Sequence, residues 1–312
     1  MNREQMDRIV RIADAVLWEG YMLYPYRPSN VKNRHRWTFG GLYPVSYAAK
    51  NGEPSELRAE VLLQAPAESK VTVIVRFLHL LSQEAHGRTF QRAVAREVTL
   101  SDLSLQCRHH RRFLYPHLDR HEGEITTRQE RIDGLVEVAV ESTAEPLHKL
   151  TLTVANTTAF RESLSTSRDQ ASVQALVATH AIFHSAAGGF LSLIDPPARF
   201  RDTASACTNK GVWPILAGAP SSAEWMLAPP MILPDYPQIA DESPGDLFDG
   251  TEIDEILTLR VLTLTDAEKE EMRQADPRLG DLLDRTESLT QEEMLRLHGA
   301  LRSPRACAAG TK

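Results

Sequence analysis

Apolar and polar residues alternate along several segments, and this pattern constrains the fold most. Apolar residues occupy every second position in segments 57–63, 136–140 and 150–154. Successive side chains of a strand point to opposite faces, so this period of two predicts half-buried β-strands. Residues 71–81 carry apolar side chains on both faces, which predicts a central strand.

The connections between these segments favour antiparallel pairing. Residues 142–148, which include Pro146, form a link short enough to join segments 136–140 and 150–154 as a hairpin. No sustained alternation of strands and helices appears between residues 56 and 233, so a parallel sheet with crossover helices is not expected. We therefore predict an antiparallel β-sandwich-like domain. Further strands are expected at residues 179–183, 189–193, 212–217 and 226–233.

Helical patterns occur at the two ends of the chain. Apolar residues recur at helical spacing over residues 6–17, and Gly20 is placed to end that helix. Near the C-terminus, the sequences that begin at Thr265 and Thr290 are typical of capping boxes, and Pro277 is placed to begin a short helix between them. The chain is thus predicted to be α+β, with an N-terminal helix and aromatic, basic extended stretch, a β-rich domain, and an acidic loop with C-terminal helices. The expected bounds are 1–55, 56–234 and 235–312.

The net charge of −7 is distributed unevenly. Residues 231–312 carry 9 basic and 18 acidic side chains, whereas residues 1–230 carry 26 and 24. This acidic C-terminal region disfavours phosphate backbones, so no nucleic-acid partner is expected. The cysteine count is odd and includes no C-x-x-C pair, which argues against a disulfide framework. No apolar stretch is long enough to span a bilayer, so we expect a cytoplasmic protein without a membrane span.

Residues 235–257 are the most acidic stretch, with eight carboxylates and no Lys or Arg. Thr251 is placed to cap a helix that begins within this stretch. A solvated acidic loop would explain the charge. Such a loop would not need the apolar side chains of Tyr236, Leu247 and Phe248, which suggest that the segment is anchored.

Aromatic and basic side chains interleave between residues 21 and 39. This mixture is typical of interface hot spots, where aromatic and Arg side chains bury area and form hydrogen bonds. Two interpretations are open: recognition of a partner, or docking on the acidic segment of the same chain. The residues concerned are Tyr21, Tyr24, Tyr26, Arg27, Lys32, Arg34, Arg36, Trp37 and Phe39.

Motifs for catalysis or metal binding are poorly represented. Cys107, His109, His117 and His121 are weak candidates for a nickel or zinc site, which needs three or four convergent nitrogen or sulfur ligands. The i, i+4 spacing of the last two would place both imidazoles on one face of a helix, but the arginines in the same stretch oppose a bound dication. Neither a G-x-S-x-G sequence nor a Walker A sequence occurs. No metal or cofactor is expected.

Three blocks of the sequence resemble a known bacterial family. They are Glu19-Gly20-Tyr21-Met22-Leu23-Tyr24-Pro25-Tyr26-Arg27 with Asn30-Val31-Lys32-Asn33-Arg34, then Gly211-Val212-Trp213-Pro214, and the acidic segment continuing through Glu252-Ile253-Asp254-Glu255-Ile256-Leu257-Thr258-Leu259-Arg260. The family that they resemble is a conserved, poorly characterised protein encoded beside high-affinity, oxygen-tolerant uptake NiFe hydrogenases.

The resemblance implies a non-enzymatic accessory protein that assists assembly or maturation of a NiFe hydrogenase by protein–protein binding. Its expected partner is a hydrogenase subunit or a maturation factor. Two alternatives stay open: a stable subunit of the hydrogenase complex, and an enzyme of unknown chemistry on a β-rich scaffold, with Asp235, Glu242, Asp246 and Asp249 as candidate acids. The family supplies no catalytic residue. The expected partner-binding residues are Tyr24, Tyr26, Arg27, Lys32, Arg34, Trp213, Tyr236, Asp246, Phe248 and Asp249.

Overall fold

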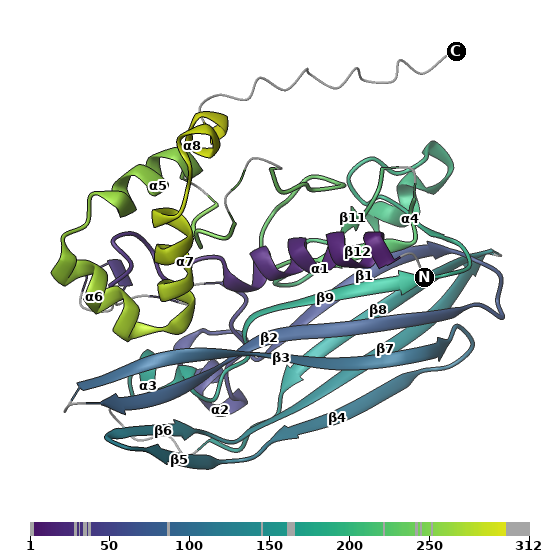
Figure 1. Cartoon of the computed structure of the whole chain (residues 1–312). Helices are drawn as coiled ribbons and strands as arrows, with labels where there is room; N and C mark the ends of the chain where they lie inside the picture. The colour runs from purple at the N-terminus through teal and green to yellow at the C-terminus, as the bar shows by residue number, and fades with distance from the viewer. Residues whose placement is uncertain are drawn as a thin grey trace. The chain divides into compact units, whose positions relative to one another are not determined.

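The chain divides into two compact units (Figure 1). The computed structural model describes residues 3–297 apart from 28–29, 31, 34–35, 37–38, 86–87, 145, 161–165, 221, 241–242, 244 and 251. The β-rich unit comprises Met1–Tyr21 and His35–Gln238, and the helical unit comprises Met22–Arg34 and Ile239–Lys312. The segment expected at 1–55 is therefore divided between the two units. The expected boundary at 234/235 lies close to the point between Gln238 and Ile239 where the chain leaves the β-rich unit for the helical unit.

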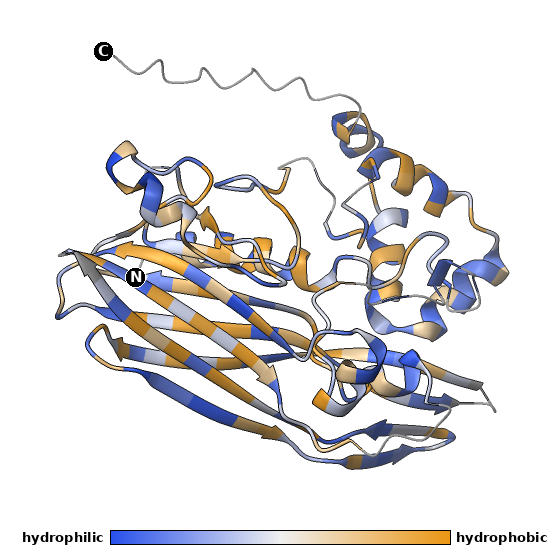
Figure 2. Ribbon diagram, turned by 180° about the vertical axis from the view of Figure 1, so that it is seen from behind, coloured by the Kyte–Doolittle hydropathy of each residue, from blue (hydrophilic) through white to orange (hydrophobic). Residues whose placement is uncertain are grey.

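One antiparallel sheet of the β-rich unit has five strands within the described residues. Their order is β10 (Gly189–Phe190), β1 (Glu56–Gln64), β8 (Leu147–Asn156), β7 (Ile132–Ala144) and β4 (His109–Tyr115). The predicted alternation is confirmed by the register, in which Ala59 of β1 and Val138 of β7 both lie opposite Leu152 of β8. Orange and blue bands alternate along the strands in Figure 2 for the same reason.

The other antiparallel sheet has seven strands in the part of the chain that the structure describes. Its path runs β11 (Ile215–Ala217), β12 (Trp225–Ala228), β9 (Val177–Ser185), β2 (Lys70–Ala85), β6 (Ile125–Gln129) and β5 (Leu118–Glu122), and β3 (Arg88–Ser104) pairs with β2. Strand β2 is central, as predicted, because it pairs with β3 and is also bonded to β9 and β6. The predicted antiparallel sandwich-like domain is confirmed.

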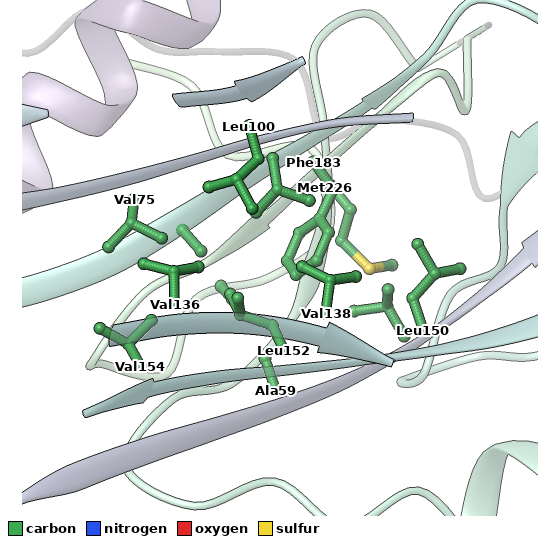
Figure 3. Packing of buried hydrophobic residues seen from close by; sticks show 14 of the residues in the cluster. Ala59, Val75, Leu100, Val136, Val138, Leu150, Leu152, Val154, Phe183 and Met226 are labelled. Carbon is green, nitrogen blue, oxygen red and sulfur yellow. The ribbon is translucent and has the colours of Figure 1, made fainter. Parts of the chain in front are cut away.

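The main core lies between the two sheets (Figure 3). Val75, Phe183 and Met226 come from the seven-stranded sheet, and Val138 and Leu152 from the five-stranded one; all are buried. Burying one such side chain stabilises the fold by about 1.5–3 kcal/mol relative to leaving it exposed.

A close approach on the five-stranded sheet requires a residue without a side chain. Gly134 of β7 lies opposite Phe113 of β4, and a Cβ atom at Gly134 would overlap the Phe113 ring. That ring in turn stacks on Phe77, with 5.7 Å between the ring centroids. Gly134 therefore allows the aromatic ring to pack flat over the strand.

Helix α1 (Arg3–Trp18) packs against β9 and β2. The predicted helical spacing is confirmed, because Ile9, Ala13 and Leu17 are fully buried. Gly20 follows the helix with φ of +69°, a left-handed conformation that favours glycine. The shorter helices of this unit are α2 (Val45–Asn51), α3 (Arg168–Ser172), η2 (Ala198–Phe200) and α4 (Arg201–Ser205).

The helical unit contains α5 (Asp254–Leu262), α6 (Asp266–Ala275), α7 (Pro277–Glu287) and α8 (Gln291–Leu297). The capping box at Thr265 is confirmed, since Thr265 and Glu268 bond each other's backbone N–H groups, and Thr290 forms the same arrangement with Glu293. Pro277 occupies the first turn of α7, as predicted. No helix in the described ranges is both long and apolar enough to cross a bilayer.

Several element bounds differ from prediction. Strand β7 continues to Ala144 and β8 begins at Leu147, so the link is shorter than residues 142–148. The regions expected as strands at 189–193, 212–217 and 226–233 form strands only at Gly189–Phe190, Ile215–Ala217 and Trp225–Ala228. Helix α5 has Ile253 rather than Thr251 at its N-cap, and Thr251 lies outside the described residues.

Candidate functional site

Asp235 joins three segments of the β-rich unit. Its Oδ2 accepts a hydrogen bond from Ser192 Oγ at 2.5 Å, and its Oδ1 accepts one from the backbone N–H of Leu216 at 2.8 Å. The next residue, Tyr236, donates its backbone N–H to Leu216 O at 2.7 Å. Ser192 Oγ also accepts bonds from two backbone N–H groups that follow it. The carboxylate therefore fixes the loop after β10, strand β11 and the segment after β12 relative to one another.

Large apolar side chains are exposed on the chain around this carboxylate. Ile194 is 60% exposed, Trp213 is 45% exposed and Ile232 is 76% exposed. Each lies two or three residues from Ser192, Leu216 or Asp235. Trp213 is held by its backbone N–H, which donates to Pro229 O at 2.9 Å. We refer to Ile194, Trp213 and Ile232 as the Trp213 surface. Tryptophan is enriched among the residues that contribute most to protein binding.

The helical unit includes residues 22–34 of the aromatic and basic motif near the N-terminus. Tyr26 is fully buried, and its hydroxyl donates to Leu247 O at 2.8 Å. Burial, together with the carboxylates of Asp249 and Asp246, raises the pKa of Tyr26, so the phenol stays protonated. Tyr26 therefore links residues 22–34 to the acidic segment within one unit.

The basic residues of this motif also have partners in the chain. Arg27 pairs with Glu268 at 3.1 Å and with Glu271 at 3.9 Å, both on α6. The guanidinium of Arg260 lies 5.6 Å from the centroid of the Tyr24 ring. The expected docking on the acidic segment thus involves Tyr26, whereas Arg27 binds carboxylates further along the chain.

Three aromatic residues expected in the site have unusual backbone conformations. Tyr26, Tyr236 and Phe248 have φ of +58°, +54° and +60°. Bulky residues rarely adopt this left-handed region, and such conformations cost about 1–3 kcal/mol each. Nearby hydrogen bonds hold them, such as that from the Phe248 backbone N–H to Asp246 Oδ1 at 2.8 Å. Strained backbone of this kind clusters at functional sites.

The remaining residues expected in the site differ in their burial and in the unit to which they belong. Phe248 is buried, Tyr236 is half-buried against the main core, and Asp249 is half-buried. Lys32 and Asp246 are exposed. Arg34 and Glu242 lie outside the described residues. Trp213, Asp235 and Tyr236 belong to the β-rich unit, and Tyr24, Tyr26 and Arg27 with Asp246 and Phe248 belong to the helical unit.

Sequence reasoning missed a buried carboxylate on β1. Glu60 is 2% exposed, and it accepts hydrogen bonds from the Arg58 guanidinium and, at 2.7 Å, from the Thr208 backbone N–H. Burial acts to raise its pKa, but these bonds and nearby Lys149 hold the pKa of Glu60 below its ordinary value. Its own backbone N–H donates to Asn209 Oδ1 at 2.7 Å. The network attaches the loop after α4 to the sheet.

Neither of the two cysteines within the described residues forms a reactive centre. Burial raises the pKa of the Cys207 thiol, which therefore stays protonated at neutral pH. Cys107 is exposed, and its Sγ lies 3.4 Å from His109 Nε2. That nitrogen also lies 2.9 Å from Ser104 O, where an imidazole N–H donates to the carbonyl. A nitrogen occupied in this way is not placed to act as a base for the thiol.

The weak metal candidates are not assembled into a ligand set. His121 lies in β5 and His117 directly precedes it, so the expected helical spacing is wrong. In extended chain, positions four apart are separated by about 13 Å. His117 instead approaches Asp119 and Glu130, at 3.6 Å and 3.4 Å. Among the described residues, no group of three or more His, Cys, Asp or Glu side chains is arranged to hold a metal ion.

No protein-family model matches this sequence, and a search of curated proteins found no match.

Proposed function

We propose that this chain is a non-enzymatic accessory protein that assists assembly or maturation of a NiFe hydrogenase in the cytoplasm. It acts by binding a hydrogenase subunit or a maturation factor. The proposal starts from the sequence blocks that resemble the protein encoded beside such hydrogenases. Residues 22–34 of the first block and residues 252–260 belong to the same helical unit, residues 19–21 belong to the β-rich unit, and the Gly211–Pro214 block contains Trp213.

The Trp213 surface is the observation that carries the proposal. A binding protein needs apolar side chains that are exposed in the free state yet held in place, because ordering them on association costs free energy. The Asp235 hydrogen bonds to Ser192 and Leu216 fix the backbone around Ile194, Trp213 and Ile232 before any partner arrives. Such prior order lowers the entropic cost of binding.

Affinity purification tests the proposal. The tagged chain is purified from cells that express the hydrogenase, and hydrogenase subunits and maturation factors are quantified by mass spectrometry. Trp213→Ala should lower their recovery, since removing a hot-spot Trp costs about 2–4 kcal/mol of binding free energy. The matched control is Val45→Ala, which truncates another exposed apolar side chain, on α2, and should leave recovery unchanged. Equal recovery with Trp213→Ala would contradict a binding role for this surface.

The same purification distinguishes an accessory protein from the two alternatives, a stable hydrogenase subunit and an enzyme. A stable subunit would remain with the mature, active hydrogenase, whereas an assembly factor would be recovered with immature subunits. The double variant Asp246→Asn, Asp249→Asn keeps side-chain shape, and the Asn carbonyl can still accept the bond from Phe248. Normal association with loss of hydrogenase activity in that variant would favour the enzyme alternative.

A further inference from the structure

Helix α5 carries an aliphatic row that stays partly exposed in the chain. Leu257 and Val261 are fully buried, whereas Ile256 is 38% exposed and Leu259 is 46% exposed. Leu262 continues the row, three positions further on. Residues three apart are neighbours on a helix surface, so these side chains form one continuous ridge.

The charges beside this ridge have a specific order. Glu255 precedes Ile256 and Arg260 follows Leu259, so the sequence Glu255-Ile256-Leu257-Thr258-Leu259-Arg260 has the spacing of positions g, a, b, c, d and e of a heptad. Among parallel coiled coils, Ile at a with Leu at d favours two strands over three or four. In a parallel pair, residue g of one helix lies beside residue e of the next heptad in its partner, which here places Glu255 against Arg260 of the other copy.

We propose that α5 is a homodimer interface, in which two copies of this chain pack their α5 helices in parallel. Ile256 and Leu259 meet their counterparts, and two Glu255–Arg260 pairs flank them. An antiparallel pair would place the two Glu255 side chains on one edge and the two Arg260 side chains on the other. The parallel arrangement is therefore the one that the charges favour.

The neighbouring structure is consistent with a second copy at this position. Arg260 is 46% exposed and is supported at the surface by Glu252, 3.8 Å away, and by the Tyr24 ring. On α8, which contacts α5, Leu295 is another exposed aliphatic side chain. The helical unit is acidic, so two copies repel each other at long range. At physiological salt, charges further apart than roughly 8 Å are largely screened, so the affinity of the dimer depends mainly on the local Glu255–Arg260 pairs and the aliphatic ridge. A contact of little more than one heptad makes a weak dimer.

Sedimentation of the purified full chain over a concentration series tests this proposal. The native chain should show a monomer–dimer equilibrium, and Ile256→Ser with Leu259→Ser should raise the dissociation constant at least tenfold. Glu255→Arg and Arg260→Glu should each weaken the dimer by about tenfold or more, because each places like charges together twice. Combined in one chain, the two reversals restore the pairs and should return the dissociation constant to within about threefold of the native value.

The control is Asp281→Arg, which reverses an exposed charge on α7 and should leave the dimer unchanged. Thermal melts of each variant show that the helical unit is folded. A chain that stays monomeric throughout the series overturns the proposal. So does a dimer that tolerates the single reversals, or one that the double reversal fails to restore. The dimer needs no hydrogenase, so this result is independent of the proposed function.

Discussion

Two buried histidines should make the β-rich unit sensitive to mild acid. His79 of β2 and His180 of β9 are both fully buried. Burial and the neighbouring Arg96 lower the pKa of His79 to about 4. Burial, with a further contribution from Arg76, lowers the pKa of His180 to about 3. One ring nitrogen of each has no hydrogen-bond partner among the described residues, so each ring is packed in its neutral form.

The sign and size of the effect follow from linkage. In the unfolded chain an imidazole titrates near pH 6.5, so acid protonates the unfolded state first. The contribution of the two neutral rings to the free energy of unfolding is therefore fully present above about pH 6.5. It is lost as the pH falls toward the folded-state pKa values. At pH 5 each ring costs about 2 kcal/mol relative to pH 7, at 1.36 kcal/mol per pH unit. The combined loss of about 4 kcal/mol is a large part of a typical stability of 5–15 kcal/mol.

Urea unfolding at pH 7 and pH 5, followed by far-ultraviolet circular dichroism, measures this loss. His79→Phe should reduce the difference between the two pH values by about 2 kcal/mol. The same variant should be destabilised at pH 7 by about 1–3 kcal/mol, because the Glu130 carbonyl loses the bond from His79 Nε2, which is 3.0 Å long. His180→Phe should reduce the pH difference similarly, and half-buried His184, whose pKa burial also lowers, accounts for part of the remainder.

The control is His110→Asn, which removes an exposed imidazole from β4 and should leave the pH difference as in the native chain. The window between pH 7 and pH 5 lies above the range in which Asp and Glu residues with lowered pKa values titrate. A native chain that loses less than about 1 kcal/mol over this window, or a His79→Phe chain that keeps the whole loss, would refute the reasoning.

Two further substitutions test the packing. Tyr26→Phe should lower the stability of the helical unit by about 1–3 kcal/mol, since the buried carbonyl of Leu247 loses its donor. Tyr24→Phe, at a half-buried ring, is the control. Equal melting temperatures of the Tyr26 variant and the native chain would contradict the role given to this bond. Gly134→Ala should destabilise the sandwich by about 1–3 kcal/mol in a urea titration, because the new methyl group overlaps Phe113. Phe113→Leu in the same chain should recover part of this loss. A Gly134→Ala chain as stable as the native one would show that the contact is unimportant.

The sequence predicted those strands in which apolar residues of the main core alternate with mainly polar residues. In β1, β7 and β8 the residues that face the main core are mostly apolar and most of the outward ones are polar, which produces the period of two. Leu62 and Leu147 are exceptions, because they lie on the outward face and are buried in a separate cluster. Strand β5 could not be predicted in this way, because all of its residues are exposed and it pairs with β6 away from the core. Its strand conformation depends on backbone pairing, which leaves no apolar period.

The positions of site residues were harder to predict because they depend on contacts between distant segments. Tyr26 has the composition of an interface aromatic, yet it is buried through a bond to a residue 221 positions away. Glu60 occupies a polar position in the alternation of β1, but the loop at Thr208 covers it. The local sequence around either residue does not indicate that a distant segment buries it. Trp213, by contrast, has the exposed side chain expected of an interface aromatic, and its backbone N–H donates to Pro229 O.

The acidic segment also bears on the choice between binding and catalysis. A general acid or base must approach substrate with an oxygen that is able to exchange a proton. Both oxygens of Asp235 already accept hydrogen bonds, and moving them would release Ser192 and Leu216, which hold the Trp213 surface. Asp246 similarly accepts the backbone N–H of Phe248, whose positive φ depends on local support. Carboxylates that fix loop backbone suit a surface that must keep its shape for a partner better than a site that must pass protons.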